Sequence, residues 1–325
     1  MSDTAATAPH PAVPRPPKRA PRSLRAWLTR NPVVLKELRS RMRGARAFVV
    51  LTVYLLLMSA FITLLYTVYL SSNASVYSRP DRMLLGKFVF GGVVGIEALL
   101  VCFITPAFTV GAIASERERQ TYDLLRTTLL SERALVLGKL VSALSYVLLL
   151  LAAALPLQSL AFLLGGVAPE EVFIATLLLM ATAFLFSAAG LFFSSLMRRT
   201  LGATILTYAF ALLTTVGLPV LLFPVALLGP VFSYNTPPLF VQAALVYAFG
   251  LLIVMNPVAT LIATELVLVN EQTVFYFTTT LYDPVTNNPV VLPLFSPWLP
   301  FTLFALAVGG VLVLLAILNV RRIEN

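Results

Sequence analysis

The sequence predicts an all-α polytopic membrane protein with six transmembrane helices. Three observations support this fold class. Of the 325 residues, 59% are hydrophobic and only 11% are charged, whereas soluble domains carry roughly 25% charged residues. Six apolar runs reach the roughly 20 residues that a helix needs to cross a bilayer. The Lys and Arg residues fall mainly into connections that would lie on one side of the membrane, as the positive-inside rule expects.

The chain before the first span divides into a tail and an amphipathic helix. Residues 1–30 are rich in Pro and Arg, which predicts a flexible cytoplasmic tail. Residues 31–46, wound as a helix, separate apolar from basic side chains. The apolar set is Val33, Val34, Leu38 and Met42, and the basic set is Lys36, Arg39, Arg41, Arg43 and Arg46. We expect this helix to lie on the anionic inner face of the bilayer, where its positive charge also orients the first span.

The transmembrane domain occupies residues 47–325. We place its six spans near residues 47–70, 88–114, 134–164, 172–197, 201–228 and 298–319. With the N-terminus inside, all but three of the 23 Lys and Arg residues lie in cytoplasmic segments or, as Lys139 does, near the cytoplasmic end of a span. The three on the outer side are Arg79, Arg82 and Lys87. The distribution predicts a multi-pass protein of the cell membrane with both termini in the cytoplasm.

A further apolar segment, residues 239–269, is interrupted by Asn256 and Pro257. If it crossed the membrane once, the last span would reverse and place Arg321 and Arg322 outside. Two half-helices that enter from the outer side and turn back at Asn256-Pro257 keep the loop charges consistent. Broken helices at membrane depth are tolerated when they pack against protein. We therefore prefer a re-entrant hairpin, followed by an outer loop over residues 270–297.

The segment from residue 115 to residue 139 is highly charged and lies between two apolar runs. Such a segment cannot lie in hydrocarbon, so residues 115–133 form a cytoplasmic loop. Glu116–Arg119 and Arg119–Asp123 are pairs at helical spacing and predict a short solvated helix. Three apolar side chains recur along one face of that helix: Tyr122, Leu125 and Leu129. A helix of this kind suits contact with a soluble partner.

Catalytic and metal chemistry find little support in the sequence. There is one His, His10, and one Cys, Cys102, and Gly86-Lys87 and Gly138-Lys139 lack the remaining residues of a phosphate loop. We predict no catalytic site, no metal and no cofactor. The net charge of +9 is concentrated in the cytoplasmic segments, which points to the lipid bilayer and not to nucleic acid as its partner.

Glu97 is the one ionisable residue well inside a predicted span. A buried membrane charge can serve a proton or substrate pathway, or it can hydrogen-bond a neighbouring helix; both interpretations stay open. An intramembrane enzyme would need paired polar residues in the spans, and Glu97 alone supports that class poorly. Gly91 and Gly95 form a GxxxG motif, which permits close helix packing.

The charged loop contains Glu116-Arg117-Glu118, Thr121, Asp123-Leu124-Leu125, Thr128, Ser131 and Gly138-Lys139, in that order. This pattern resembles the loop of type-2 ABC transporter permeases, which reads roughly E-R-E-x-x-T-x-E/D-L-L, then T-P-L-S, then G-K. Leu129 departs from the family Pro, and Ala134 from a frequent Glu. The stretch NPVVLKELR before the first span, the Asn256-Pro257 break and the six spans add to the resemblance.

The resemblance implies a permease subunit that dimerises with a second copy or a paralogue. It also implies cytoplasmic ATP-binding-cassette ATPase subunits as partners, and export as the direction of transport. The ATPase-coupling interface would comprise Glu116, Arg119, Thr121, Tyr122, Asp123, Leu125 and Leu129. A competing function is a non-transporting subunit that transmits ATPase motion to an extracytoplasmic partner, and only a flux assay separates the two. The sequence does not identify a substrate.

Overall fold

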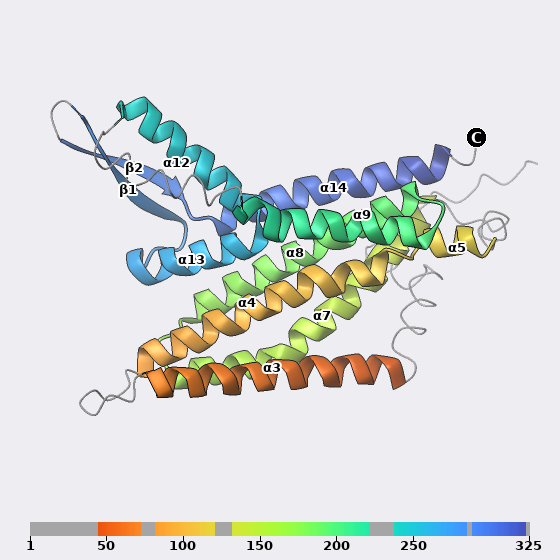
Figure 1. Ribbon diagram of the computed structural model, residues 1–325, viewed down its shortest axis with the longest axis horizontal. Helices are drawn as coiled ribbons and strands as arrows, with labels where there is room; N and C mark the ends of the chain where they lie inside the picture. The colour runs from red at the N-terminus through yellow and green to blue at the C-terminus, as the bar shows by residue number, and fades with distance from the viewer. Residues whose placement is uncertain (1–44, 73–81, 121–131, 221–236, 285–287, 323–325) are drawn as a thin grey trace, which may run out of the picture.

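The computed structural model describes residues 45–72, 82–120, 132–220, 237–284 and 288–322. Within these residues, six helices are long and apolar enough to cross a membrane, and they run roughly along the long axis of the molecule (Figure 1). Their bounds are α3 Ala45–Ser72, α4 Arg82–Thr109, α7 Glu132–Leu164, α8 Pro169–Leu196, α9 Thr200–Leu212 and α14 Trp298–Arg322. A π-helix, η1 Leu213–Gly217, continues α9. The predicted fold class is confirmed.

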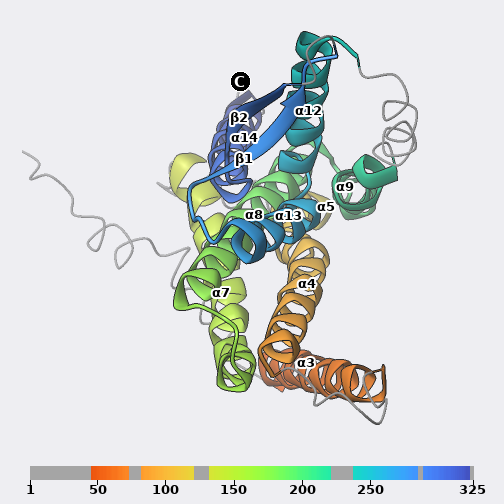
Figure 2. The same cartoon turned by 90° about the vertical axis from the view of Figure 1, so that its left-hand side faces the viewer.

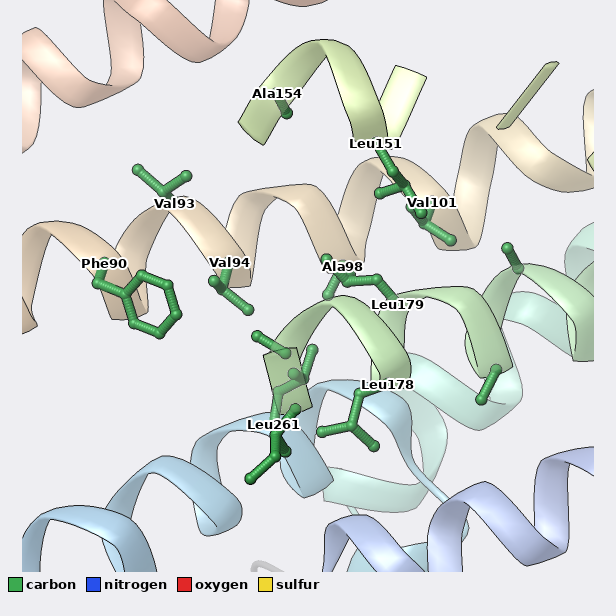
Figure 3. Close-up of a cluster of buried hydrophobic side chains, with 14 of the residues drawn as sticks. Phe90, Val93, Val94, Ala98, Val101, Leu151, Ala154, Leu178, Leu179 and Leu261 are labelled. Carbon is green, nitrogen blue, oxygen red and sulfur yellow. The ribbon is translucent and has the colours of Figure 1, made fainter. Parts of the chain in front are cut away.

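Helix α8 lies at the centre of the bundle and contacts α4, α7, α9 and α14. Its second half is rich in small residues, which let neighbouring helices approach closely. At Gly190 the approach is close, because an added Cβ would lie 2.1 Å from the Thr109 Oγ1 of α4. Figure 3 shows how α4, α7, α8 and α13 meet around Val94, Ala98, Leu151, Leu178 and Leu261. These long-range contacts bury the middle of the bundle.

Helix α3 lies at the edge of the bundle, on the side away from α14 (Figures 1 and 2). It contacts α4 and α7, but large apolar side chains such as Leu56, Leu57 and Leu64 stay exposed. An apolar surface of this extent is unfavourable in water and favourable in lipid. This exposure is therefore that of a lipid-facing helix.

Two shorter helices, α12 Leu239–Val254 and α13 Pro257–Glu271, are bent by 118° at the expected position. Their junction lies near the middle of the bundle, and their outer ends lie at the end of the molecule that also holds the strands (Figure 1). Pro257 has no N–H and occupies the first turn of α13, while the Asn256 side chain accepts a hydrogen bond from the Ala259 N–H at 2.8 Å. These residues end one helix and cap the next.

The expected outer loop, residues 270–297, contains two antiparallel strands. They are β1 Tyr276–Tyr282 and β2 Pro289–Phe295, with Tyr276 opposite Phe295 and Tyr282 opposite Pro289. The strand signal is the run of aromatic and Thr residues in β1, which the neighbouring Asn and Pro residues obscured. Asp283 donates its N–H to Asn288 O at 3.1 Å beyond the last pair. The segment expected to be an outer loop thus contains a β-hairpin.

Candidate functional site

A short helix, α5 Ala114–Glu118, follows α4 at the end of the bundle that also holds the C-terminus of α14 (Figure 1). The N–H groups of Ile113 and Ala114 both donate to the Ser194 Oγ of α8, at 2.9 and 3.0 Å. These bonds use two backbone donors at the start of α5 that have no partner inside the helix. Ser194 thereby fixes the turn between α4 and α5.

Glu116 faces the bundle from α5. Its carboxylate forms an ion pair with the Lys139 Nζ of α7 at 2.7 Å. The Lys139 side chain is only 4% exposed and that of Glu116 is 23% exposed, so the charge of Lys139 depends on a nearby anion. Glu116 was expected to contact the ATPase, whereas the structure gives it a contact within the chain. Sequence reasoning named Lys139 only as part of a motif and missed this pairing.

Arg117 ties α5 to the end of α8. Its Nη1 donates to Ser195 O at 2.8 Å and to Met197 O at 3.4 Å. The last carbonyls of a helix have no partner within it and carry partial negative charge. A guanidinium group at this position satisfies two of them, and sequence reasoning had no signal for the contact because its partners are backbone atoms.

Glu118 ties α5 to the start of α9. Its Oε2 accepts from the Thr200 Oγ1 at 2.6 Å and from the Thr200 N–H at 3.1 Å. These two hydrogen bonds lower the pKa of the exposed Glu118 carboxyl, as expected for an anion at a helix N-terminus. Because the pKa is lowered on folding, the contact stabilises the fold at neutral pH and loses this effect as the pH falls through the carboxyl's folded pKa.

Three consecutive charged residues thus connect α5 to three different helices. Arg119 follows as an exposed residue at the C-terminal end of α5, and Gln120 has a left-handed backbone with φ of 57°. Helix α5 ends at Glu118, and the rest of the predicted helix, from residue 121, lies outside the described residues. The remaining residues of the predicted coupling interface, Thr121, Tyr122, Asp123, Leu125 and Leu129, lie outside the described residues, so their apolar stripe stays a prediction.

Glu97 is fully buried in α4 and joins two neighbouring helices. Its Oε1 accepts from the Tyr54 hydroxyl of α3 at 3.4 Å, and its Oε2 accepts from the Gln158 Nε2 of α7 at 2.5 Å. These contacts match the interpretation of Glu97 as a group that hydrogen-bonds adjacent helices. Polar groups buried at this depth are favourable only when they are hydrogen-bonded.

The junction of α12 and α13 is bound to the π-helix that follows α9. The fully buried Asn256 donates its Nδ2 to Thr214 O at 2.7 Å and to Thr215 O at 3.0 Å. A π-turn displaces the usual backbone hydrogen bonds, and the amide of Asn256 supplies donors to carbonyls there. Helix α9 therefore contacts α5 at its start through Thr200 and the α12–α13 junction beyond its end.

Comparison with known families supports the assignment that the loop motif suggested. The model of the ABC-2 family transporter proteins matches residues 32–320, which include the charged loop, the α12–α13 pair and the six candidate spans except for the last residue of the sixth. A comparison with curated proteins finds no match. Permeases of this family are membrane transport components that generally pair with ATP-binding-cassette ATPase subunits. The chain therefore belongs to the ABC-2 transporter family, as a multi-pass membrane subunit of an ABC transporter.

Proposed function

We propose that this subunit couples ATP hydrolysis by separate cytoplasmic ATPase subunits to export of a substrate, as one half of a permease dimer. The observation that carries the proposal is the connection of α5 to α7, α8 and α9 by Glu116, Arg117 and Glu118. Force applied to the charged loop would reach three helices together, because each is held by its own charged contact. The partner of the dimer is a second copy or a paralogue.

Helix α9 offers a route from the charged loop to the α12–α13 pair. Glu118 binds Thr200 at its start, and Asn256 binds Thr214 and Thr215 in the π-helix beyond its end. We infer that α12 and α13 form the re-entrant hairpin that narrows the outer end of the transport path. Movement of α5 would shift α9 through the Glu118–Thr200 contact, and α9 would shift the hairpin tip through the Asn256 hydrogen bonds. These hydrogen bonds must either persist or be replaced by others when the transport path opens or closes.

A non-transporting subunit is the second candidate. The β1–β2 hairpin projects at the end of the molecule opposite α5 (Figure 1), where an extracytoplasmic partner of such a subunit would bind. The same contacts through α9 would then transmit ATPase motion to that partner. Vesicles that contain the complex separate the two functions, since only a transporter moves a solute across the membrane when ATP is supplied.

The proposed orientation predicts which residues an impermeant thiol reagent reaches in intact cells. Gln120 and Asn288 are exposed; Gln120 follows α5 and Asn288 precedes β2, and these two elements lie at opposite ends of the molecule (Figure 1). In a Cys102→Ala background, we expect labelling of Asn288→Cys but not of Gln120→Cys, because α5 is proposed to be cytoplasmic. As a control, permeabilised cells should show labelling at both introduced cysteines. Labelling of Gln120→Cys alone in intact cells would show that the orientation is the reverse of the proposed one.

The proposed coupling function predicts a ranking of effects on copurification of the ATPase. Leu125→Ala removes an apolar side chain from the predicted interface and should weaken the complex by about 2 kcal/mol, or ~30-fold in affinity. Glu118→Gln keeps a hydrogen-bond acceptor for Thr200 and should change the affinity for the ATPase far less. Quantitative pull-down with the tagged chain measures both. An ATPase retained equally by the two variants, or lost more with Glu118→Gln, argues against the stripe as the anchor.

A further inference from the structure

A cavity of about 180 Å³ lies between α4, α8 and α13. Its walls are mostly apolar and include Phe90, Val94, Leu178 and Leu261, which Figure 3 shows where these helices meet. Gly91 and Gly95 also line it, and no described atom outside their own stretch of α4 lies within 4 Å of a Cβ built on either glycine. On this face the GxxxG motif therefore leaves open space instead of the close helix packing that it permits.

Three polar side chains face this apolar space: Glu171 of α8, and Thr264 and Glu265 of α13. Glu171 and Thr264 are only 6% and 3% exposed. Within the part of the chain that the structure describes, Glu171 Oε2, Thr264 Oγ1 and Glu265 Oε1 have no hydrogen-bond partner. Buried polar oxygens without a partner are unfavourable, and three around one cavity indicate a ligand that donates hydrogen bonds.

The charges around the cavity favour a cation. Lys87 donates to Glu171 Oε1 at 3.4 Å, and Glu265 lines the same cavity as Glu171. One Lys therefore faces two carboxylates, which leaves one negative charge when both are ionised. The described residues contain no cluster of three or more His, Cys, Asp or Glu suited to a metal ion, and mostly apolar walls suit a hydrated ion poorly.

We propose that this cavity binds a single ammonium group attached to an apolar body. An ammonium carries one positive charge and three N–H donors, which match the excess negative charge and the three oxygens without partners. A dry cavity of roughly 150 Å³ holds a benzene-sized molecule, so this one accommodates an amino group and its first carbons. The group could come from an aminophospholipid or from a free amphipathic amine. This site goes beyond the proposed function and needs no ATPase coupling.

The test measures binding of n-octylamine to the full chain, with any subunits that copurify, in phosphatidylcholine nanodiscs. Binding to the folded state raises the midpoint of thermal unfolding, and the dose dependence gives an apparent affinity. We expect a rise with n-octylamine but not with n-octanol, which has the same tail and no charge. In discs that contain phosphatidylethanolamine, a smaller n-octylamine effect identifies the lipid head group as the occupant, whereas an unchanged effect identifies a free amine.

Four variants separate charge from volume, each judged by its own n-octylamine affinity. Glu171→Gln and Glu265→Gln should each weaken binding about tenfold, because each removes a charged acceptor. Lys87→Met should strengthen it by removing a competing cation, and Gly95→Val should abolish it by filling the cavity while every charge stays. Glu271→Gln, at an exposed position, is the matched control. Equal effects of n-octylamine and n-octanol, or unchanged affinity in both Gln variants, would overturn the proposal.

Discussion

Glu116→Gln is expected to destabilise the protein by about 3 kcal/mol, because it removes the carboxylate that lies 2.7 Å from the buried Lys139 Nζ. This value is near the lower end of the usual range for breaking a buried ion pair, since Glu116 keeps 23% of its side-chain exposure. The measurement is the free energy of unfolding in nanodiscs. Arg119→Gln, at an exposed position of the same segment, is the control and should change it little.

A second substitution tests the physical reason. Glu116→Gln combined with Lys139→Met removes both charges of this ion pair, so the buried Lys139 charge is lost together with the carboxylate that it contacts. The double variant should therefore recover much of the stability that the single variant loses. If the double variant is as unstable as Glu116→Gln alone, the loss comes from packing and not from the ion pair. A recovered double variant that no longer couples ATP hydrolysis to transport would support the mechanical role proposed for α5.

Asn256→Ala is expected to destabilise the protein by about 3 kcal/mol and to impair transport. It removes the acceptor that caps α13 at Ala259, typically about 1 kcal/mol, and it removes the donor to the carbonyls of Thr214 and Thr215. Unsatisfied backbone groups at membrane depth cost several kcal/mol each, and relaxation of the π-helix recovers part of that. Thermal unfolding in nanodiscs measures the loss. Asn270→Ala, near the exposed end of α13, should have a small effect.

Asn256→Asp separates the two roles of the amide. The carboxylate keeps an acceptor for the Ala259 N–H but has no donor for Thr214 and Thr215, and it places negative charge beside their carbonyls. We expect it to be at least as destabilising as Asn256→Ala. Stability close to that of the natural chain would mean that capping alone accounts for Asn256, and that its bonds to the π-helix contribute little.

Features that depend on local sequence could be predicted. The six spans follow from apolar length, and the structure places helices at all six positions. Their described ends differ from the predicted ones by a few residues, and residues 221–228 of the fifth predicted span lie outside the described residues. The bend at Asn256-Pro257 follows from the missing N–H of Pro257. The loop motif gave the family, which the match over residues 32–320 confirms. The strands β1 and β2 were missed because their Asn- and Pro-rich surroundings are typical of a loop.

The membrane depth of each residue was predicted from the apolar runs alone, and one cluster of charged side chains was therefore missed. Glu171 and Glu265 lie near the ends of their apolar segments, and the sequence predicted no site at either of them. The structure buries Glu171 beside Lys87 and places both carboxylates at a cavity. This burial depends on the packing of α8 against α4 and α13. The sequence of a single helix does not indicate which neighbouring helix will cover it.

The sequence by itself determined the membrane class, the spans, the broken segment and the family motif, since each depends on residues that are close together in the chain. Only the tertiary structure decided what the motif contacts. The partners of Glu116, Arg117 and Glu118 lie 23, 78 and 82 residues further along, and two of the three contacts involve backbone atoms. Such contacts leave no periodic or compositional signal, because they depend on where distant helices begin and end once they are packed.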